Sequence, residues 1–585
     1  PYLKARAEKN NVKLPLSLDG TQPKFSRSSG FNSTAKLKGL VHVDLIKFIR
    51  AAYAAYMQSE TLSLNEVSKE FLGDTKKDFK IKSSSQLDKD DFKNYYEYNL
   101  HDSVLALRLF EKFWPDMKEF TRVMTEPLFE VTRNSMSKNV ESYILHNLNR
   151  FEEIPEKRPT HNDIGERRSK ERYEGGFVYE PTPGIYEDIS MFDFTSSYGS
   201  VIVTYNLSRS TYLPEETKKN KKENKKTHNI EVQEKKLEFS MKQGFFPSML
   251  EEIIKLRKRF KKDLKNLEEK NKQDTTDYAV LRARSNAFKL LANASYGYLG
   301  FFGARYYCYE AAAATAAFAR KSIKEAIDNI NNEGYETIYS DTDSIAFARK
   351  GKSKKEVKEF LKKLNSKMPG IMELELEGFF KRGIWVTKRS GKLGAKKKYA
   401  LIDENNRIKI RGFETVRRDW CPLARETQNK IINLILEDGN EKRALNFLRD
   451  VVTKLKNKDI DVDELIIKTQ LKKPLEEYNA VSPHVVAARK MQENKIPISE
   501  GNLIEYYISD SQTNKNTKDK KQNTNLVRDR VKLPSEQKDE DEKDYDIKYY
   551  LERQILPAVE NILNLFNIKI KEIIDGKRQM TLGEF

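Results

Sequence analysis

The chain has 585 residues and a formal net charge of +19, from 107 lysine and arginine residues against 88 aspartate and glutamate residues. This length excludes a single hydrophobic core and predicts several domains. The positive surplus favours a polyanionic partner, nucleic acid before membrane, although a general richness in lysine would produce the same surplus.

Two cysteines are too few for a disulfide framework or a cysteine-based zinc site. The sequence contains no apolar run long enough to span a bilayer as a helix. We therefore expect a soluble, cytoplasmic protein.

The first 115 residues alternate helix-like and strand-like pieces. We expect a buried strand at 41–45 that leads into a helix, and a second helix over 95–113, where apolar residues recur at helical spacing. Tyr98 and Asp102 lie one turn apart on this second helix, where they could jointly bind a metal-bound water or stand as an ordinary surface pair. The chain begins at Pro1 inside a helix-forming segment, which predicts a fragment, a processed product or one piece of a split protein.

Two polar stretches interrupt the apolar patterns. The charged stretch 152–182 contains the pair Gly175 and Gly176, which permits close approach of the backbone to a phosphate or simply makes a turn. Residues 217–236 are rich in lysine, asparagine and glutamate and predict a solvated loop.

An apolar strand pattern between these stretches ends in an acidic residue. Asp193 closes the strand, and the following residues turn into the start of a helix. Amides over 194–198 would point outward at such a turn and could hold a triphosphate. Tyr198 is an aromatic residue that could lie under a sugar and exclude a 2′-hydroxyl.

Two basic helical patterns follow, over 245–265 and from Tyr278 onward. In the second, Arg282, Lys289 and Tyr296 are seven residues apart and so lie near one face. The pair predicts a finger-like helical hairpin that holds an anion, or else a merely solvated charged hairpin.

A strand–turn–strand pattern over 337–347 places two carboxylates in its turn. Asp341 and Asp343 are two residues apart, so their oxygens can point the same way and would repel one another without a cation between them. Mg²⁺ is the simplest such cation. The alternative is an exposed hairpin tip with acidic turn residues.

These motifs, in this order and over nearly the whole chain, resemble archaeal-type B-family DNA polymerases. Residues 193–211 resemble the family's motif A, 289–297 its motif B, K-x-x-x-N-S-x-Y-G, and the Asp341 hairpin its motif C. Residues 173–176 resemble the Y-x-G-G loop, and 396–399 the K-K-x-Y segment. The chain departs from the pattern at four positions: Ser197 replaces Leu, Gly199 and Arg209 each replace Pro, and Ala294 replaces Ser. The loss of the Pro after Tyr198 makes ribonucleotide exclusion the property most in question.

The resemblance implies an α+β multidomain fold, a right-hand polymerase with a partial RNase H-like α/β exonuclease domain. The expected divisions are the C-terminal half of a 3′–5′ exonuclease domain at 1–115, a connecting region at 116–185, the first part of the palm at 186–240, the fingers at 241–305, the second part of the palm at 306–420, and the thumb at 421–585.

The resemblance also implies roles for individual residues. Asp193, Asp341 and Asp343, with the backbone of Phe194, would bind two Mg²⁺ ions, for which Mn²⁺ could substitute, and catalyse nucleotidyl transfer onto a primer 3′ end. Residues expected to bind the incoming deoxynucleotide are Ser196, Ser197, Tyr198, Arg257, Lys289, Asn293 and Tyr296. Residues expected to bind primer-template DNA are Tyr173, Gly175, Gly176, Thr342, Lys396, Lys397, Lys398, Tyr399, Arg417 and Arg418.

Further expectations concern proofreading and partners. Tyr98 and Asp102 match one exonuclease motif, but the family's other metal-binding carboxylates lie upstream of Pro1, so we expect little proofreading without an N-terminal partner polypeptide. The tail residues Gln579, Leu582 and Phe585 resemble a peptide that docks on the sliding clamp, and the alternative is a frayed end. A nucleoid-associated polymerase is expected. A catalytically idle DNA-binding scaffold of a split holoenzyme is the alternative.

Overall fold

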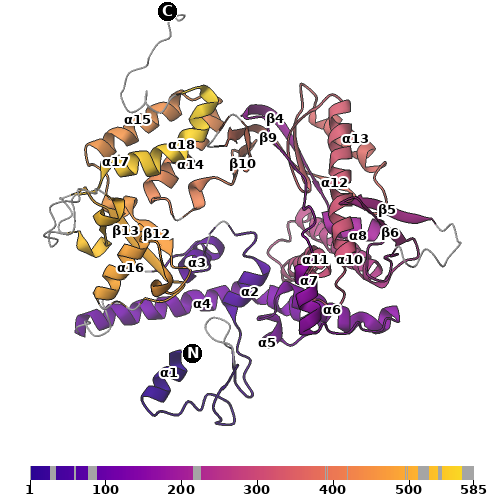
Figure 1. Cartoon of the computed structure of the whole chain (residues 1–585), viewed down its shortest axis with the longest axis horizontal. Coiled ribbons are helices and arrows are strands. Elements are labelled where there is room, and N and C mark those ends of the chain that lie inside the picture. Colours follow the sequence, from indigo (N-terminus) through magenta and orange to yellow (C-terminus); the bar gives the residue numbers. More distant parts are fainter. Residues whose placement is uncertain are drawn as a thin grey trace, which may run out of the picture.

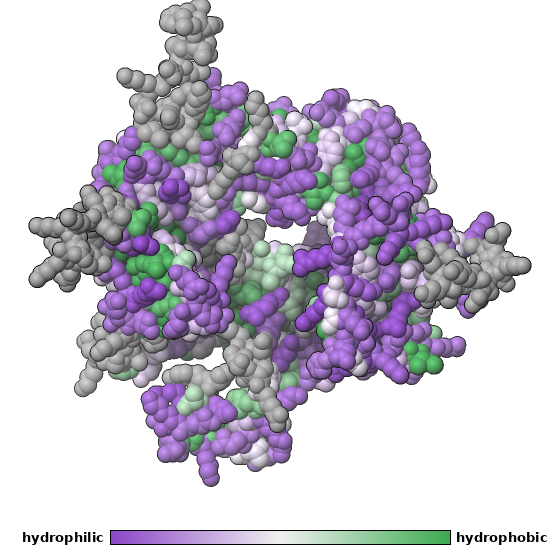
Figure 2. Space-filling model, in the orientation of Figure 1, coloured by the Kyte–Doolittle hydropathy of each residue, from purple (hydrophilic) through white to green (hydrophobic). Residues whose placement is uncertain are grey.

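The computed structural model describes residues 2–26, 34–57, 59, 61–76, 89–214, 226–388, 391, 393–417, 419–494, 496, 498–510, 526–537 and 543–568. These residues surround an opening (Figures 1 and 2). The long helix α4 (Lys89–Met124) closes the ring below, and strands β4 (Gly184–Phe194), β9 (Leu374–Thr387) and β10 (Gly394–Asp403) close it above.

The N-terminal segment, here residues 2–124, is mainly helical where it is described. Besides α4, it contains α1 (Tyr2–Lys9), β1 (Lys24–Phe25), β2 (Ala35–Lys36), α2 (Leu45–Ala52) and α3 (Leu64–Leu72). The strand expected at 41–45 is wrong, because the Asp44 side chain accepts a hydrogen bond from the Lys47 amide and so caps a helix that begins at Leu45. The helix expected over 95–113 is confirmed as part of α4.

Helix α4 packs on α5 (Leu128–Val131), on α6 (Met136–Asn147) and on α11 (Thr276–Leu299). Helix α7 (His161–Ser169) comes after α6 in the chain. Glu119 of α4 is fully buried, and its carboxylate accepts from Arg284 of α11 at 2.7 Å and from Arg122 at 2.7 Å. A buried carboxylate with two guanidinium partners strongly disfavours separation of the two helices, since either charge would be left without its partner.

A seven-stranded antiparallel sheet forms the centre of the molecule. Its order is β11-β10-β9-β4-β8-β7-β3, in which the remaining strands are β3 (Val178–Tyr179), β7 (Glu336–Asp341), β8 (Ser344–Ala348) and β11 (Ile408–Arg411). The register pairs Ser344 of β8 with Asp193 of β4 on one side and with Asp341 of β7 on the other. Two carboxylate-bearing positions therefore flank one residue at the same end of the sheet.

Helices α12 (Tyr309–Asn332) and α13 (Lys354–Asn365) pack on strands of this sheet, and α8 (Ser197–Thr204) packs on α10 (Phe245–Glu269), α11 and α12. α10 and α11 lie against one another, which confirms the predicted helical pair. Part of the loop expected at 217–236 is instead a hairpin of β5 (Thr227–Val232) and β6 (Lys235–Ser240). Val232 and Leu237 of this hairpin are buried, which explains why a polar sequence still forms strands.

The C-terminal part has a core of its own. It contains α14 (Pro422–Asp438), α15 (Lys442–Lys456), α16 (Pro483–Glu493), α17 (Ile547–Tyr550) and α18 (Leu556–Leu563), with a sheet of β12 (Ile467–Gln470), β13 (Leu503–Ile508) and β14 (Val531–Lys532). This part lies across the opening from α10, α11 and α12 (Figure 1). Among the described residues, no helix combines the length and the apolar character needed to cross a bilayer.

Candidate active site

Asp193, Asp341 and Asp343, here called the carboxylate site, lie at one end of three neighbouring strands. Asp193 is the penultimate residue of β4, Asp341 ends β7, and Asp343 belongs to the turn that leads into β8. The Phe194 amide donates to the Asp343 carbonyl at 2.9 Å, which ties this turn to β4. The sheet therefore fixes the spacing of all three residues.

Nearby positive charge, from Lys409 at Asp193 and from Lys397 at Asp343, only partly offsets the cost of charging these two members of the carboxylate site. Burial raises the pKa of Asp193 to about 7, and repulsion from Asp343 adds to the rise. Burial raises the pKa of Asp343 to about 6, with repulsion from Asp341 as the next cause. A cation between these groups would reverse both shifts, because it favours the charged carboxylates.

Asp341 has a cationic neighbour of its own. Its Oδ1 lies 3.1 Å from the Lys397 Nζ and accepts a hydrogen bond from the Thr342 hydroxyl at 3.1 Å. Among the described residues, no three acidic, histidine or cysteine side chains already converge as metal ligands. The donor set nevertheless fits Mg²⁺, since carboxylate oxygens and the carbonyl of Phe194 are the hard oxygen ligands that this ion prefers.

Two cations, Arg257 of α10 and Lys289 of α11, stand near the carboxylates and are called the cation pair below. The Arg257 guanidinium donates to the Ser196 hydroxyl at 2.6 Å. Burial lowers the pKa of both side chains, and Arg257 lowers the pKa of Lys289 further, while the charge of Asp193 opposes the shift in both. Two poorly solvated cations of this kind are suited to a polyanion such as a triphosphate.

The amides predicted to be free over 194–198 are only partly so. Phe194 donates to Asp343, and Thr195 donates to the Glu373 carbonyl at 2.9 Å, so the prediction is wrong for these two. Ser196 takes a left-handed conformation, with φ of 50°, and is the residue before α8. The amides of Ser197 and Tyr198 lie in the first turn of α8, where no carbonyl of the helix can accept from them.

An aromatic stack stands next to this helix start. The ring of Tyr198 stacks on Tyr296 with centroids 4.1 Å apart and planes 17° apart. The Tyr296 hydroxyl lies 3.3 Å from the hydroxyl of Tyr173, which begins the Y-x-G-G loop. Gly199 replaces the proline of motif A. A Cβ at this helical position would lie 3.4 Å from Ile254 Cδ1, so the space beside Gly199 is narrow but would admit a Cβ.

The Y-x-G-G loop is pressed against both the turn and the stack. A Cβ on Gly176 would lie 2.8 Å from the Thr342 Oγ1 and 3.0 Å from the Tyr198 hydroxyl, whereas a Cβ on Gly175 would meet nothing within 4 Å. Arg320 of α12 donates to the carbonyls of Glu174 and Gly175 at 2.6 Å and 2.8 Å. Only a residue without a side chain fits at Gly176.

The residues expected to bind DNA through the K-K-x-Y segment separate into two groups. Lys396 and Lys397 are exposed on β10. Lys398 is instead buried, with Nζ 2.8 Å and 2.9 Å from the two Glu414 carboxylate oxygens, and Tyr399 is buried against Trp385. The structure therefore gives Lys398 and Tyr399 packing contacts in place of a surface position.

The other predicted residues are placed as follows. Arg417 is exposed and pairs with Asp419 at 2.7 Å, and Arg418 lies outside the described residues. Asp102 pairs with Lys76 at 2.6 Å, and the same ammonium lies 4.7 Å from the Tyr98 ring centroid. The tail residues Gln579, Leu582 and Phe585 lie outside the described residues.

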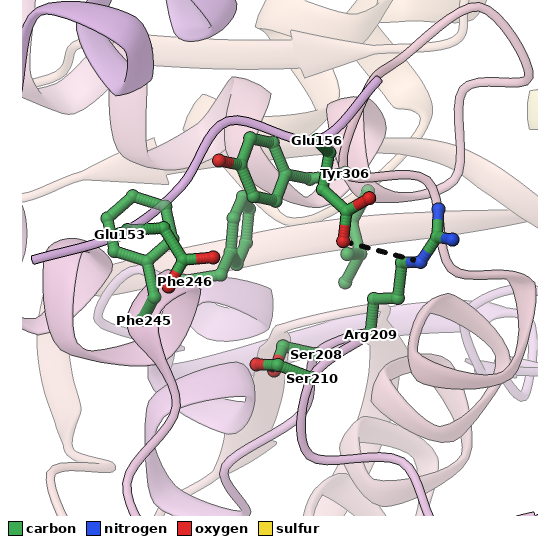
Figure 3. A pocket seen from close by; sticks show the side chains of 9 residues that line it. Glu153, Glu156, Ser208, Arg209, Ser210, Phe245, Phe246 and Tyr306 are labelled. Carbon is green, nitrogen blue, oxygen red and sulfur yellow. Dashed lines mark hydrogen bonds and ion pairs between the residues drawn. The ribbon is translucent and has the colours of Figure 1, made fainter. Parts of the chain in front are cut away.

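A small cavity elsewhere in the molecule takes no part in this site. It measures about 10 Å³, room for about one water molecule, and its lining includes Arg209, Glu153, Glu156 and Tyr306 (Figure 3). Arg209, which departs from motif A, lies 3.6 Å from the Glu156 carboxylate. The arginine that replaces the proline therefore forms an ion pair with Glu156.

Sequence reasoning missed one residue at the cation pair. Tyr56, four residues beyond α2, has its ring centroid 4.7 Å from the Lys289 Nζ, and its hydroxyl accepts from Asn293 Nδ2 at 3.4 Å. No local pattern marks it, because it is 237 positions from Asn293 in the chain.

Residues 127–566, which include the carboxylate site and the cation pair, match the family model described as DNA polymerase family B. The chain belongs to DNA polymerase family B. It is 33% identical over 593 residues to DNA polymerase 1 of Pyrococcus abyssi, and 32% identical over 590 residues to a DNA polymerase of Thermococcus gorgonarius. Each match covers 100% of this chain and 71% of the relative.

A solved structure agrees with this assignment. The family B DNA polymerase of Pyrobaculum calidifontis superimposes with a TM-score of 0.70 at 28% identity, over 97% of this chain and 69% of that one. The expected resemblance and the right-hand α+β fold class are confirmed, and the chain is a DNA-directed DNA polymerase by family. The domain boundaries and the roles of single residues stay predictions.

A glycine-to-alanine substitution in the Y-x-G-G loop tests the packing of the site. Gly176→Ala should lower the kcat/KM of nucleotide incorporation about tenfold or more, because its methyl group would displace Thr342 or Tyr198 from the site. Gly165→Ala on α7 is the matched control and should stay within about twofold, since nothing lies within 4 Å of a Cβ at this helical position outside the site. Single-nucleotide incorporation kinetics measure both, and equal effects of the two substitutions would contradict the packing described.

Proposed function

We propose that this chain extends a primer 3′ end by template-directed transfer of a deoxynucleotide, with two Mg²⁺ ions as cofactors and Mn²⁺ as a substitute. The observation that carries the proposal is the arrangement of three carboxylates on neighbouring strands beside a pair of poorly solvated cations. This combination suits phosphoryl transfer, in which positioning and charge stabilisation supply most of the catalysis.

Asp193 and Asp341 would hold the two ions, with the Phe194 carbonyl and with Asp343 as a weaker ligand. When bound, the ions supply activation of the 3′-hydroxyl and stabilisation of the leaving pyrophosphate. Lys397, which pairs with Asp341 in this structure, would then be released toward DNA. Two raised pKa values in the same small space support this assignment, because they mark a site in which negative charge is not yet balanced.

Arg257 and Lys289 would bind the triphosphate, with the first-turn amides of Ser197 and Tyr198 and the hydroxyl of Ser196 beside them. The stack of Tyr198 on Tyr296 would form a flat support under the sugar, placed to disfavour a 2′-hydroxyl. Asn293 lies one turn after Lys289 on the same face of α11, so it would also lie near the incoming nucleotide.

Primer-template DNA would cross the opening between the two sides of the ring (Figure 2). Gly176, which contacts Thr342 and Tyr198, would approach the duplex together with Gly175 and with Tyr173, which contacts Tyr296. Lys396, Lys397 and Arg417 are exposed cations that would contact phosphates. Such contacts fix the register of the duplex without reading its sequence. A nucleoid-associated location follows from this substrate.

Removing a single carboxylate tests the catalytic assignment. Asp193→Ala and Asp341→Ala should each reduce incorporation at least about a thousandfold, since a two-metal site loses a bridging ligand. Binding to a primer-template duplex should change little, because duplex contacts come from other residues. Primer extension and duplex-binding titrations measure the two properties.

Asp188→Asn is the matched control. Asp188 lies on the same strand, with φ of 54°, a conformation that asparagine tolerates, and it pairs with Arg349 at the surface. It should retain normal incorporation. Retained synthesis in Asp193→Ala or Asp341→Ala would overturn the assignment.

We further propose that this chain alone has little 3′–5′ exonuclease activity. A two-metal exonuclease needs several carboxylates around its ions, whereas Asp102 pairs with the ammonium of Lys76, which lies over the ring of Tyr98. An exposed apolar stripe on α4 supports an additional partner polypeptide there: Phe92, Tyr96, Leu100, Val104 and Leu107. Rapid Mg²⁺-dependent degradation of a 3′ end by the purified chain would contradict the proposal.

The tail is proposed to bind a sliding clamp through Gln579, Leu582 and Phe585, with apolar anchors seated in a groove. The double substitution Leu582→Ala and Phe585→Ala should abolish stimulation of primer extension by the clamp of the source organism and leave extension without the clamp unchanged. Thr581→Ala, next to the first apolar anchor, is the matched control and should keep full stimulation. Undiminished stimulation in the double variant would refute clamp docking by this tail.

A further inference from the structure

Tyr56 lies on the cation pair, although it comes from the N-terminal segment. Its ring faces the ammonium of Lys289 at 4.7 Å, and its hydroxyl accepts from the amide of Asn293 at 3.4 Å. Tyr56 also interacts electrostatically with Arg257, so the side chain is near all three groups. The side chain of Tyr56 is 51% exposed, so burial in the hydrophobic core does not fix its position.

The backbone presents Tyr56 at this place through a tight turn. α2 ends at Ala52, Tyr53 follows as its C-cap, and the amide of Tyr56 donates to the Tyr53 carbonyl at 2.8 Å. The ring of Tyr53 packs on Phe113 and Phe71, with centroids 5.0 Å and 5.9 Å away. Tyr53 thus anchors the turn in the core, and Tyr56 projects from it toward α11.

The partners of Tyr56 are the groups that the proposed function assigns to the incoming nucleotide, and the inference rests on that function. A ring face and a neutral hydroxyl oxygen are weak partners for a poorly solvated ammonium and an amide, compared with the oxygens of a triphosphate. When a nucleotide binds Lys289 and Asn293, these two residues must therefore lose their contacts with Tyr56.

We propose that Tyr56 competes with the incoming deoxynucleoside triphosphate for Lys289 and Asn293, and so sets the affinity of the polymerase site for its substrate. A contact made only in the nucleotide-free state weakens nucleotide binding by its own free energy. The N-terminal segment thereby takes part in substrate binding, through a residue that lies outside the region matched by the family model.

The test measures nucleotide affinity without chemistry. The complementary deoxynucleoside triphosphate is titrated, with Mg²⁺, into the full chain bound to a primer-template whose primer ends in a 3′-dideoxynucleotide. Tyr56→Ala should lower the Kd about three- to tenfold, because it removes both contacts. Tyr56→Phe keeps the ring over Lys289 and loses only the hydroxyl, so it should give a smaller decrease.

Tyr96→Ala is the control, because Tyr96 is 65% exposed on α4, where its ring centroid lies 6.1 Å from that of Phe92 and 6.4 Å from that of Tyr95. It should leave the Kd unchanged. A damaged fold would weaken binding, so tighter binding in Tyr56→Ala separates competition from destabilisation. In steady-state extension, Tyr56→Ala should lower KM and leave kcat near that of the unaltered chain.

Equal or weaker binding by Tyr56→Ala, in a chain that otherwise binds the complementary nucleotide, would overturn the inference and leave the proposed function intact. Absence of nucleotide binding by the unaltered chain would overturn the proposed function and the inference with it.

Discussion

Repulsion among Asp193, Asp341 and Asp343 is the constraint on which the site depends. The sheet register sets Asp193 and Asp341 on either side of Ser344, and the turn between β7 and β8 brings Asp343 against β4. Burial then raises the pKa of Asp193 to about 7 and that of Asp343 to about 6. Such a cluster is tolerated because the surrounding strands fix it, and its unbalanced charge suits cations that arrive with the substrate.

The positive charges of Arg257 and Lys289 lie near the carboxylates and partly offset their repulsion. Arg257 and Lys289 come from two helices that pack together, and helix α11 is in turn held to α4 by the buried Glu119. Contacts with the N-terminal segment as well as with the helices beside the sheet thus position Arg257 and Lys289. This shared support explains how Tyr56 can reach Lys289 from so distant a part of the chain.

Sequence patterns predict which residue types gather at the candidate site better than they predict the contacts between those residues. Asp193, Asp341 and the basic helices can be identified because strand ends, acidic turns and helical charge leave a local signal, and the family resemblance puts them in order. The strand expected at 41–45 is wrong because one side chain, Asp44, caps a helix there. Lys398 is not a surface residue because its partner Glu414, from the helical turn after β11, buries it. The amides of Phe194 and Thr195 and the role of Tyr56 depend on distant partners, which no local pattern reveals.

The most direct test of the account is primer extension by the purified 585-residue chain on a recessed primer-template, with Mg²⁺ and the four deoxynucleotides. We expect the primer to grow, and each added base to be complementary to the template. Tight binding of the duplex without extension would contradict it, because the carboxylate site and the cation pair would then hold DNA without performing the transfer.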